Sequence, residues 1–370
     1  MSLVLDAFFG ATKWLHNKYE YRKYVRRSDR RVAESLKKVK TRRRLTKEQA
    51  KEVRDFYKKL TGKRITLLYH EYFYSRTGVY SKEYMPIGFF EADLMGRANQ
   101  WSRYYPSYSD KNMDDIYLPH ILHPQSILKN MNGYFYYKGE PVGKEEAIKL
   151  CRNIEKAIIK PSMQSKGVGV KLLRVSDGVS NIDNKTIEQL FDTYKKNFLI
   201  QEAVRQHPVI SALNPTSVNT IRIMTYRSGM EIIVVYSVIR IGRLNQVIDN
   251  QSAGGISTVI HEDGTLGKYA FGVAGDDMIE KTDTGIVLEG YKIPGFEKAI
   301  EVVKKSHFDL PFFDIIGWDI SINEEEEPVL IEWNGNAGPS QTACGTGLGK
   351  YTERIVSELM PRKNTRSFIK

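Results

Sequence analysis

The sequence predicts an α+β protein with a small antiparallel lobe, a larger β-rich body and a basic helical arm before them. The chain has 370 residues, enough for two or three lobes with a sizeable core. From residue 218 onward, long apolar strand patterns follow one another, whereas earlier segments mix short strands with helical patterns. The excess positive charge is confined to the first 64 residues.

The N-terminal arm carries the whole net charge of the protein. Residues 1–64 contain 21 Lys and Arg against 7 Asp and Glu, a net charge of +14, and the remaining residues contain 35 against 37, a net charge of −2. This pattern predicts one or two basic helices. Two interpretations stay open: a solvated arm packed on the body, or peripheral contact with an anionic membrane. Nucleic-acid binding is disfavoured because no aromatic RNA-binding motif accompanies the charge. The apolar residues that could enter a membrane interface precede the basic run: Leu3, Phe8, Phe9, Trp14 and Leu15.

Composition argues against secreted and membrane-spanning classes. Cys151 and Cys344 provide neither a disulfide framework nor the spacing of a zinc site, which is typical of a reducing cytoplasm. No apolar run reaches the ~18 residues of a transmembrane helix. The first residues are a poor signal peptide, because their apolar stretch precedes the basic one. We therefore expect a cytoplasmic protein whose arm could reach the inner face of the cytoplasmic membrane.

The elements are predicted in the following order. Residues 64–75 read as a strand, and residues 110–124 as a helix that starts at Asp110 and stops before Pro124. Short strands follow in GYFYYKGEPV, KAIIKPS and GVGVKLLRVS, then a helix in TIEQLFDTYKKN and a strand in FLIQEAV. The long strands after residue 218 lead to an amphipathic helix in PGFEKAIEVVKKSHFDL, a hairpin across the acidic turn 323–327, and a final helix in YTERIVSELM.

The hairpin supplies a candidate metal site. Glu332 and Asn334 are two residues apart on a strand, so they project to the same side while Trp333 faces the other way. The preceding strand brings Asp319 opposite this pair. Carboxylate and amide oxygens are the donors that Mg²⁺ prefers, and Mg²⁺ usually takes its remaining ligands from substrate phosphates. The alternative is a strand end whose polar residues simply meet water.

A glycine-containing loop follows an apolar strand in AIIKPSMQSKGVGVKLL. The strand delivers Lys160, and Ser165 and Lys166 lie at the tip of the loop. Gly167 and Gly169 would let backbone N–H groups approach phosphates closely. The loop lacks the Gly-Lys-Ser/Thr of a Walker motif, and a plain β-hairpin is the alternative.

Three further segments carry polar groups at the ends of apolar strands. Gln201 and Glu202 end one strand and could face an adenine and a ribose. Arg222 and Arg240 are each flanked by apolar residues, which suits an enclosed phosphate or carboxylate, or alternatively a core acid. The loop 249–257, with Asn250, has the glycines of a substrate-closing loop.

Taken together, these segments resemble the ATP-grasp superfamily, and in particular the sugar-transfer-associated ATP-grasp proteins of bacterial surface-polysaccharide gene clusters, often called hexapeptide transferases. The resemblance covers roughly residues 45–355 and rests on the ordered set LTKEQAKEVRDFYKKLTGKR, YHEYFYSRTG, SDKNMDDIYL, IIKPSMQSKGVGV, IQEAV, NPTSVNTIRIMTY, DNQSAGGIS and IGWDIS…VLIEWNGNAGPS. It implies an ATP-grasp fold, in which two α/β lobes clasp ATP. The domains would be a basic arm (1–62), a small α/β region before the ATP-grasp lobes (63–112), a lid (113–200) and a large subdomain with the metal site (201–370).

The resemblance also implies a role for each residue. Lys111 and Lys160 look like the two nucleotide lysines, and Arg222 and Arg240 like the arginines that steady the γ-phosphate and an acyl phosphate, so that Lys160, Arg222 and Arg240 would be catalytic. D-Alanine–D-alanine ligases carry an arginine two residues before the first metal aspartate, and here that place is Gly317. The remaining implied assignments are the phosphate-covering loop Ser165, Lys166, Gly167 and Val168, the adenine segment Gln201, Glu202, Ala203 and Val204, and the metal ligands Asp319, Glu332 and Asn334.

The implied activity is carboxylate–amine ligation with ATP and Mg²⁺. ATP would phosphorylate a small acid such as an amino acid, and an amine on a sugar precursor of a surface polymer would attack the acyl phosphate. Two alternatives are a sugar or polyol kinase with the same fold and a non-catalytic scaffold that binds through the arm. The scaffold needs none of the lysines or metal ligands.

Overall fold

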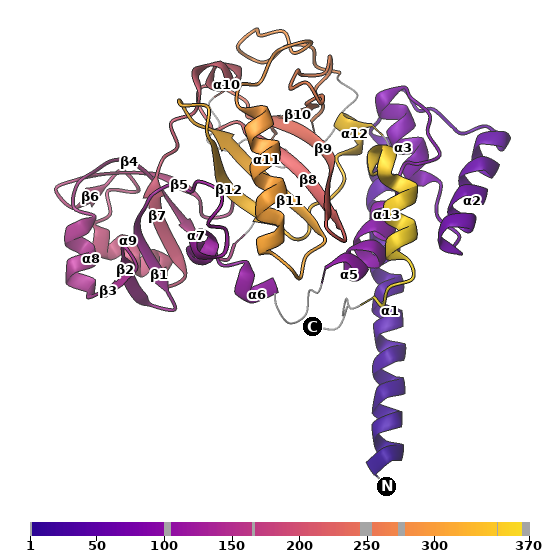
Figure 1. Cartoon of the computed structure of the whole chain (residues 1–370), viewed down its shortest axis with the longest axis horizontal. Coiled ribbons are helices and arrows are strands. Elements are labelled where there is room, and N and C mark those ends of the chain that lie inside the picture. The colour runs from indigo at the N-terminus through magenta and orange to yellow at the C-terminus, as the bar shows by residue number, and fades with distance from the viewer. Residues whose placement is uncertain are drawn as a thin grey trace.

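A computed structural model of the chain describes residues 2–99, with side chains from residue 15 onward, and residues 105–164, 167–244, 254–272, 278–345 and 347–364. Two sheets stand side by side, and a long N-terminal helix projects from the far side of the larger one (Figure 1). The expected α+β architecture with two lobes and a helical arm is therefore confirmed.

The small lobe is a seven-stranded antiparallel sheet in the order β3-β2-β1-β7-β4-β5-β6. Helices α8 (Lys144–Leu150) and α9 (Ile187–Tyr194) share one core with this sheet, and α9 starts with a capping box at Thr186. The strands are β1 (Ser126–Met131), β2 (Tyr134–Tyr137), β3 (Glu140–Val142), β4 (Ile154–Pro161), β5 (Lys171–Ser176), β6 (Val179–Ser180) and β7 (Phe198–Glu202).

The large lobe is a five-stranded antiparallel sheet in the order β10-β9-β8-β11-β12. Helix α11 (Phe296–Ser306) covers one face (Figure 1), and α2, the helical segment 87–98 and α13 share a core with the other. Covered on both faces, β11 is buried at every residue. The strands are β8 (Thr220–Ser228), β9 (Glu231–Ile241), β10 (Ile256–Val259), β11 (Ile315–Ile322) and β12 (Pro328–Asn334); the helices are α2 (Lys47–Thr61), α10 (Pro208–Leu213), α12 (Gln341–Cys344) and α13 (Thr352–Leu359).

The N-terminal region is helical where a strand was expected. Residues 64–75 do not form a strand; α3 (Leu68–Thr77) occupies most of that segment. Tyr69 and Phe73, four residues apart, pack with Val32 of α1 (Ser2–Lys37) and with Tyr84. This tertiary contact outweighs the strand-like composition.

The segment before the small lobe also differs from expectation. The described residues of 63–112 form helices and one isolated bridge instead of an α/β unit. The helix predicted over 110–124 is a short 3₁₀ turn (Lys111–Met113) followed by α7 (Asp114–Tyr117). It ends early because Pro119 disfavours a helical conformation at Leu118, whose φ and ψ are −124° and 63°.

Part of the basic N-terminal region, residues 1–62, packs into the body of the protein. Val53 and Tyr57 of α2 are fully buried in the core that α2 shares with the large sheet. Only the N-terminal part of α1 stands clear of the body (Figure 1). Within the described part of the chain, no helix is long and apolar enough to cross a membrane.

Asn99 fastens the N-terminal region to the large sheet. Its side-chain amide donates to the carbonyl oxygens of Ile315 (2.8 Å) and Gly335 (2.7 Å) and accepts from the backbone N–H groups of Asp314 (2.9 Å) and Ile315 (3.0 Å). Asn99 is fully buried, so these bonds replace water completely.

Candidate active site

A cavity of about 510 Å³ lies between the two sheets. That volume lies in the range of small-molecule sites. Strand β4 and the loop after it line one side, and β8, β9, β11 and β12 line the other. The predicted site residues that line it are Lys111, Lys160, Gly167, Gln201, Glu202, Val204, Arg222, Arg240, Asp319, Glu332 and Asn334.

Strand pairing places the predicted metal ligands beside the arginines. Asp319 of β11 lies opposite Glu332 of β12 on one side and opposite Arg222 of β8 on the other. Arg240 of β9 lies opposite Thr220 of β8, two residues before Arg222, so the two arginines project from the same face of the sheet. The expectation that the hairpin brings Asp319 opposite the Glu332 strand is confirmed.

The carboxylate of Asp319 is held by two guanidinium groups. Arg222 donates from Nε to Oδ1 at 2.5 Å and from Nη2 to Oδ2 at 2.7 Å, the two-bond geometry that suits arginine. Arg240 adds an ion pair at 3.2 Å, and the Asn334 amide donates to Oδ2 at 3.3 Å. Burial alone would raise the pKa of Asp319, but Arg222 and Arg240 hold it below its usual value. The group is therefore an anion at neutral pH.

Gly317 explains why β11 carries no arginine of its own here. A Cβ at Gly317 would lie 2.3 Å from the Cβ of Ala337 and 3.3 Å from Cδ of Arg222. Since real Cβ atoms do not approach that closely, no side chain fits. The Cβ of Ala337 and the side chain of Arg222 from the neighbouring strand β8 occupy that space.

On the opposite side of the cavity, Lys160 projects from β4 and is only 7% exposed. Burial and the positive charge of Lys111 lower the pKa of Lys160 to about 8. Lys111 is brought next to it because its backbone N–H bonds to the carbonyl of Ser162, just past β4, at 3.1 Å. The ammonium group of Lys111 lies 3.2 Å from Glu332, so Lys111 links the small-lobe side of the cavity to the β11–β12 hairpin.

Asp114 is the site residue that sequence reasoning missed. It is 8% exposed and lines, with Lys111 and Lys160, a second cavity of about 20 Å³. Burial, opposed by Lys160 and Lys111, raises the pKa of Asp114 to about 7. The Trp333 indole lowers the pKa of Asp114, so the residue that faces away from Glu332 also affects the site. The available signal was the spacing of Asp114 from Lys111, one turn along the chain.

The glycine loop turns back on β4. Gly167 and Gly169 have φ of 73° and 74°, and a Cβ at Gly169 would lie 2.8 Å from the ring of Pro161. Val168 is 61% exposed and does not line the cavity, and neither does Ala203. Ser165, Lys166 and Asn250 lie outside the described residues.

The donor set fits Mg²⁺ bridging phosphates better than a metal held by protein alone. Asp319 and Glu332 are the carboxylates and Asn334 the amide; among the described residues, no cluster of three or more His, Cys, Asp and Glu side chains could hold a metal. Mg²⁺ commonly uses one or two carboxylates plus phosphate oxygens. The four cations around the cavity suit such a polyanion. These metal and nucleotide assignments stay predictions.

Comparison with protein families identifies the class. Residues 90–356 match the family described as sugar-transfer associated ATP-grasp, which covers most of the chain. The protein therefore belongs to this family. A comparison with curated proteins finds no match.

Solved structures share a distant likeness. They include N5-carboxyaminoimidazole ribonucleotide synthetase from Thermotoga maritima, with 14% identity over 70% of this chain and 52% of that one and a TM-score of 0.36. A D-alanine–D-alanine ligase from Bacillus anthracis has 13% identity over 68% and 67%, with a TM-score of 0.39. The ligase from Helicobacter pylori has 15% over 69% and 59%, with a TM-score of 0.40. The chain spans about half the length of the first matched structures.

Proposed function

We propose that this protein is an ATP-dependent carboxylate–amine ligase that forms an amide through an acyl phosphate. The observation that carries the proposal is the inter-lobe cavity, in which Lys111 and Lys160 on one side face Arg222 and Arg240 on the other, beside the Asp319/Glu332 pair. Membership of the ATP-grasp family supports the same chemistry.

The roles follow from position and charge. Lys111 and Lys160 would bind the phosphates of ATP, and Gln201 to Val204 would lie along the adenine. Asp319, Glu332 and Asn334 would hold Mg²⁺, which when bound neutralises phosphate charge. Arg222 and Arg240 would orient the transferred phosphoryl group and the acceptor carboxylate, so that positioning supplies most of the rate.

The reaction would proceed in two balanced steps. A carboxylate oxygen attacks the γ-phosphorus, the bond to the β-phosphate oxygen breaks, and ADP leaves. An amine nitrogen then attacks the acyl carbon, phosphate leaves, and the nitrogen gives up one proton. We propose an amino acid or similar small acid as donor and an amino group on a sugar precursor as acceptor, with the latter resting on the family's description.

A phosphate-release screen of amino acids and amino sugars with Mg·ATP, with hydroxylamine as a trap, tests the proposal. A ligase forms a hydroxamate with the correct acid, whereas a sugar or polyol kinase forms a phosphoester and no hydroxamate. Glu332→Ala should abolish turnover without changing the melting curve, because Glu332 is partly exposed. Glu301→Ala, at an exposed position of α11, is the matched control and should keep activity. Full turnover in the Glu332 variant would remove that residue from the site.

A further inference from the structure

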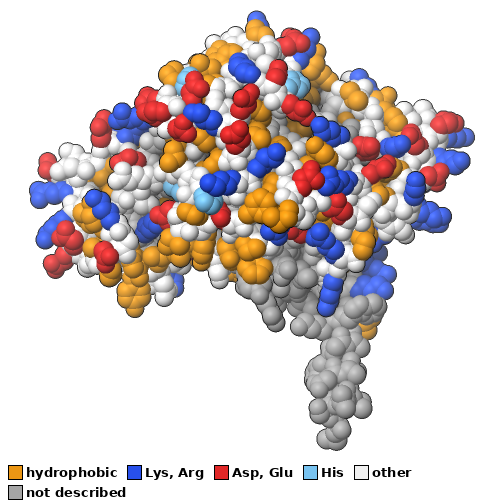
Figure 2. All heavy atoms as spheres, in the orientation of Figure 1, with side chains coloured by type: hydrophobic (Ala, Val, Ile, Leu, Met, Phe, Trp, Pro, Cys, Tyr) orange, Lys and Arg blue, Asp and Glu red, His pale blue; other side chains and the backbone are white. Residues whose placement is uncertain are grey.

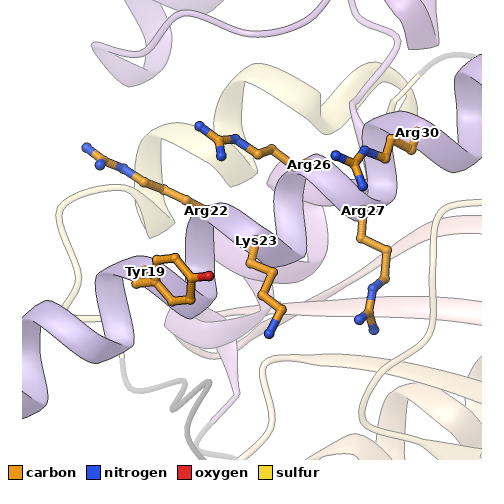
Figure 3. Close-up of a pocket in the computed structure, with 6 residues that line it drawn as sticks. All are labelled: Tyr19, Arg22, Lys23, Arg26, Arg27 and Arg30. Carbon is orange, nitrogen blue, oxygen red and sulfur yellow. The ribbon is translucent and has the colours of Figure 1, made fainter.

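The outer face of α1 carries a row of cations. Each member has another three or four residues away, which places them all on one broad face of the helix. Figure 3 shows these side chains extending from successive turns of α1, with the Tyr19 ring at the N-terminal end of the row. We call this set the α1 basic stripe: Tyr19, Arg22, Lys23, Arg26, Arg27 and Arg30.

The inner face of the same helix is already engaged. Tyr21 donates to Asp93 at 2.5 Å, Tyr24 bonds to Glu91, and Ser28 bonds to Tyr69 at 2.5 Å. Further along, Val32 and Leu36 are buried. These contacts fix which face of α1 packs against the body. The basic stripe lies on the opposite face and is therefore exposed to solvent.

Most cations of the stripe have no acidic partner among the described residues. Lys23 pairs with Glu20 on the same helix at 3.3 Å. Within the described ranges, none of the four arginines of the stripe makes an ion pair: Arg22, Arg26, Arg27 and Arg30. Four uncompensated charges within a few turns repel one another, so the stripe is well suited to an external anion.

Apolar side chains adjoin the stripe on its N-terminal side. Leu15 is 58% exposed and Tyr19 is 61% exposed, one turn apart. The helix backbone continues to Ser2. A helix of 36 residues is about 54 Å long, and Figure 1 shows its N-terminal end away from both lobes.

We propose that the α1 basic stripe, with Leu15 and Tyr19, binds an anionic phospholipid surface. Basic clusters on a helix bearing exposed aromatic and aliphatic residues suit the headgroup region, where cations meet phosphate and apolar groups enter the interface. Residues 65–370 carry a net charge of −2, and the face in Figure 2 shows acidic and basic side chains interspersed over both lobes. A nucleic acid would use the cations but give exposed Leu15 no role. This proposal does not rest on the proposed ligase activity.

Sedimentation of the full chain with vesicles tests this. The vesicles would be phosphatidylcholine alone, or with roughly a third phosphatidylglycerol, at about 50 mM and about 500 mM salt. We expect binding to the anionic vesicles at low salt and at least about tenfold weaker binding in R22Q/R26Q/R27Q/R30Q, because each surface cation contributes measurably. ATP turnover should be unchanged.

The matched control removes four exposed cations from α2 in K51Q/R54Q/K58Q/K59Q and should keep vesicle binding. L15S/Y19S should weaken binding while keeping its salt dependence. No binding of the unmodified chain to anionic vesicles at low salt overturns the proposal. Equal loss in both quadruple variants would also overturn it, as a net-charge effect. So would stripe-dependent binding to duplex DNA without binding to vesicles.

Discussion

The two sides of the cleft hold their charges in opposite ways. On the large-lobe side, Asp319 is locked by Arg222 and Arg240, so the charges compensate one another before any ligand arrives. On the small-lobe side, Lys160 is buried next to Lys111, and its charged form is disfavoured. The charges on the large-lobe side are therefore already paired within the protein. On the small-lobe side, a bound anion would stabilise the charged form of Lys160.

Replacing Arg222 is the most direct way to disrupt the charge cluster of Asp319, Arg222 and Arg240. Removing one partner of a buried ion pair typically costs 3–5 kcal/mol. Since Arg240 still faces Asp319, Arg222→Met should lower the free energy of unfolding by about 3 kcal/mol and abolish ATP turnover. Urea unfolding and phosphate release measure the two effects. Arg222→Lys keeps the charge but not both hydrogen bonds to Asp319, so its stability and turnover should lie between those of the unmodified protein and Arg222→Met.

Arg227→Met is the matched control for Arg222. Arg227 lies on the same strand and bonds to Asp314 through Nε (3.2 Å) and Nη2 (2.9 Å), outside the cavity. It should lose stability and retain turnover per folded molecule. If Arg222→Met retained turnover in the same way, the arginine would belong to the fold alone.

The small-lobe side is tested by removing its lysines. Charge-assisted contacts to phosphate are worth about 1.5–3 kcal/mol, so Lys160→Ala and Lys111→Ala should each weaken ATP binding by roughly 10- to 150-fold. Calorimetry measures the affinity. Lys129→Ala, which breaks an ion pair with Asp115 outside the cavity, should leave it unchanged. Unchanged affinity in both site variants, with lost stability instead, would make the lysines partners of fold carboxylates.

Substitution of Gly317 in β11 tests how closely the large-lobe side of the cavity is packed. Gly317→Ala should cost about 1–3 kcal/mol of stability, because overpacking a closed core displaces its neighbours. The double variant G317A/A337G removes the nearest clash, with Ala337, and should recover part of the loss. Thermal unfolding of the three variants measures this. If Ala337→Gly did not restore stability to Gly317→Ala, the contact with Ala337 would not be the cause of the destabilisation.

The smallest expected effect is a shift in pH dependence at Asp114. A bound phosphate favours the charged form of Lys160, whose pKa lies at about 8 without it, so ATP affinity should fall as the pH rises through that value. Ionised Asp114 supports that charge. In D114N the fall should therefore begin at a lower pH. Affinity titrations from neutral to alkaline pH measure the midpoint, with Asp115→Asn as control. An unmoved midpoint would separate Asp114 from Lys160.

Much of the site was predictable because its residues stand in short ordered motifs. Glu332 and Asn334 share a strand face by period alone, and the hairpin turn sets Asp319 opposite Glu332. The Arg222–Asp319 bond joins residues 97 positions apart and depends on β8 lying next to β11, which no local pattern specifies. For the same reason, the charge compensation on this side could not be read from the sequence.

The errors arose where tertiary contacts decide the local structure. The segment at 64–75 has strand-like composition but becomes α3 because α1 offers a partner for Tyr69 and Phe73. Asp114 was overlooked because one of several acids in a polar segment looks solvated. Asp114 is buried, and Lys160 and Trp333, which act on its pKa, lie far from it in the sequence.

The buried amide of Asn99 has a consequence for how the molecule opens. It joins the end of an N-terminal helix to β11 and to Gly335, just past β12, so these elements should unfold as one cooperative unit. Hydrogen exchange at the amides of Asp314 and Ile315 should then report global unfolding, while amides of the small-lobe edge strand β6 exchange through local fraying. In Asn99→Ala, the amides of Asp314 and Ile315 should exchange faster than those at the centre of β8. This difference would show that the contact between the N-terminal helices and the large sheet opens before the sheet itself unfolds.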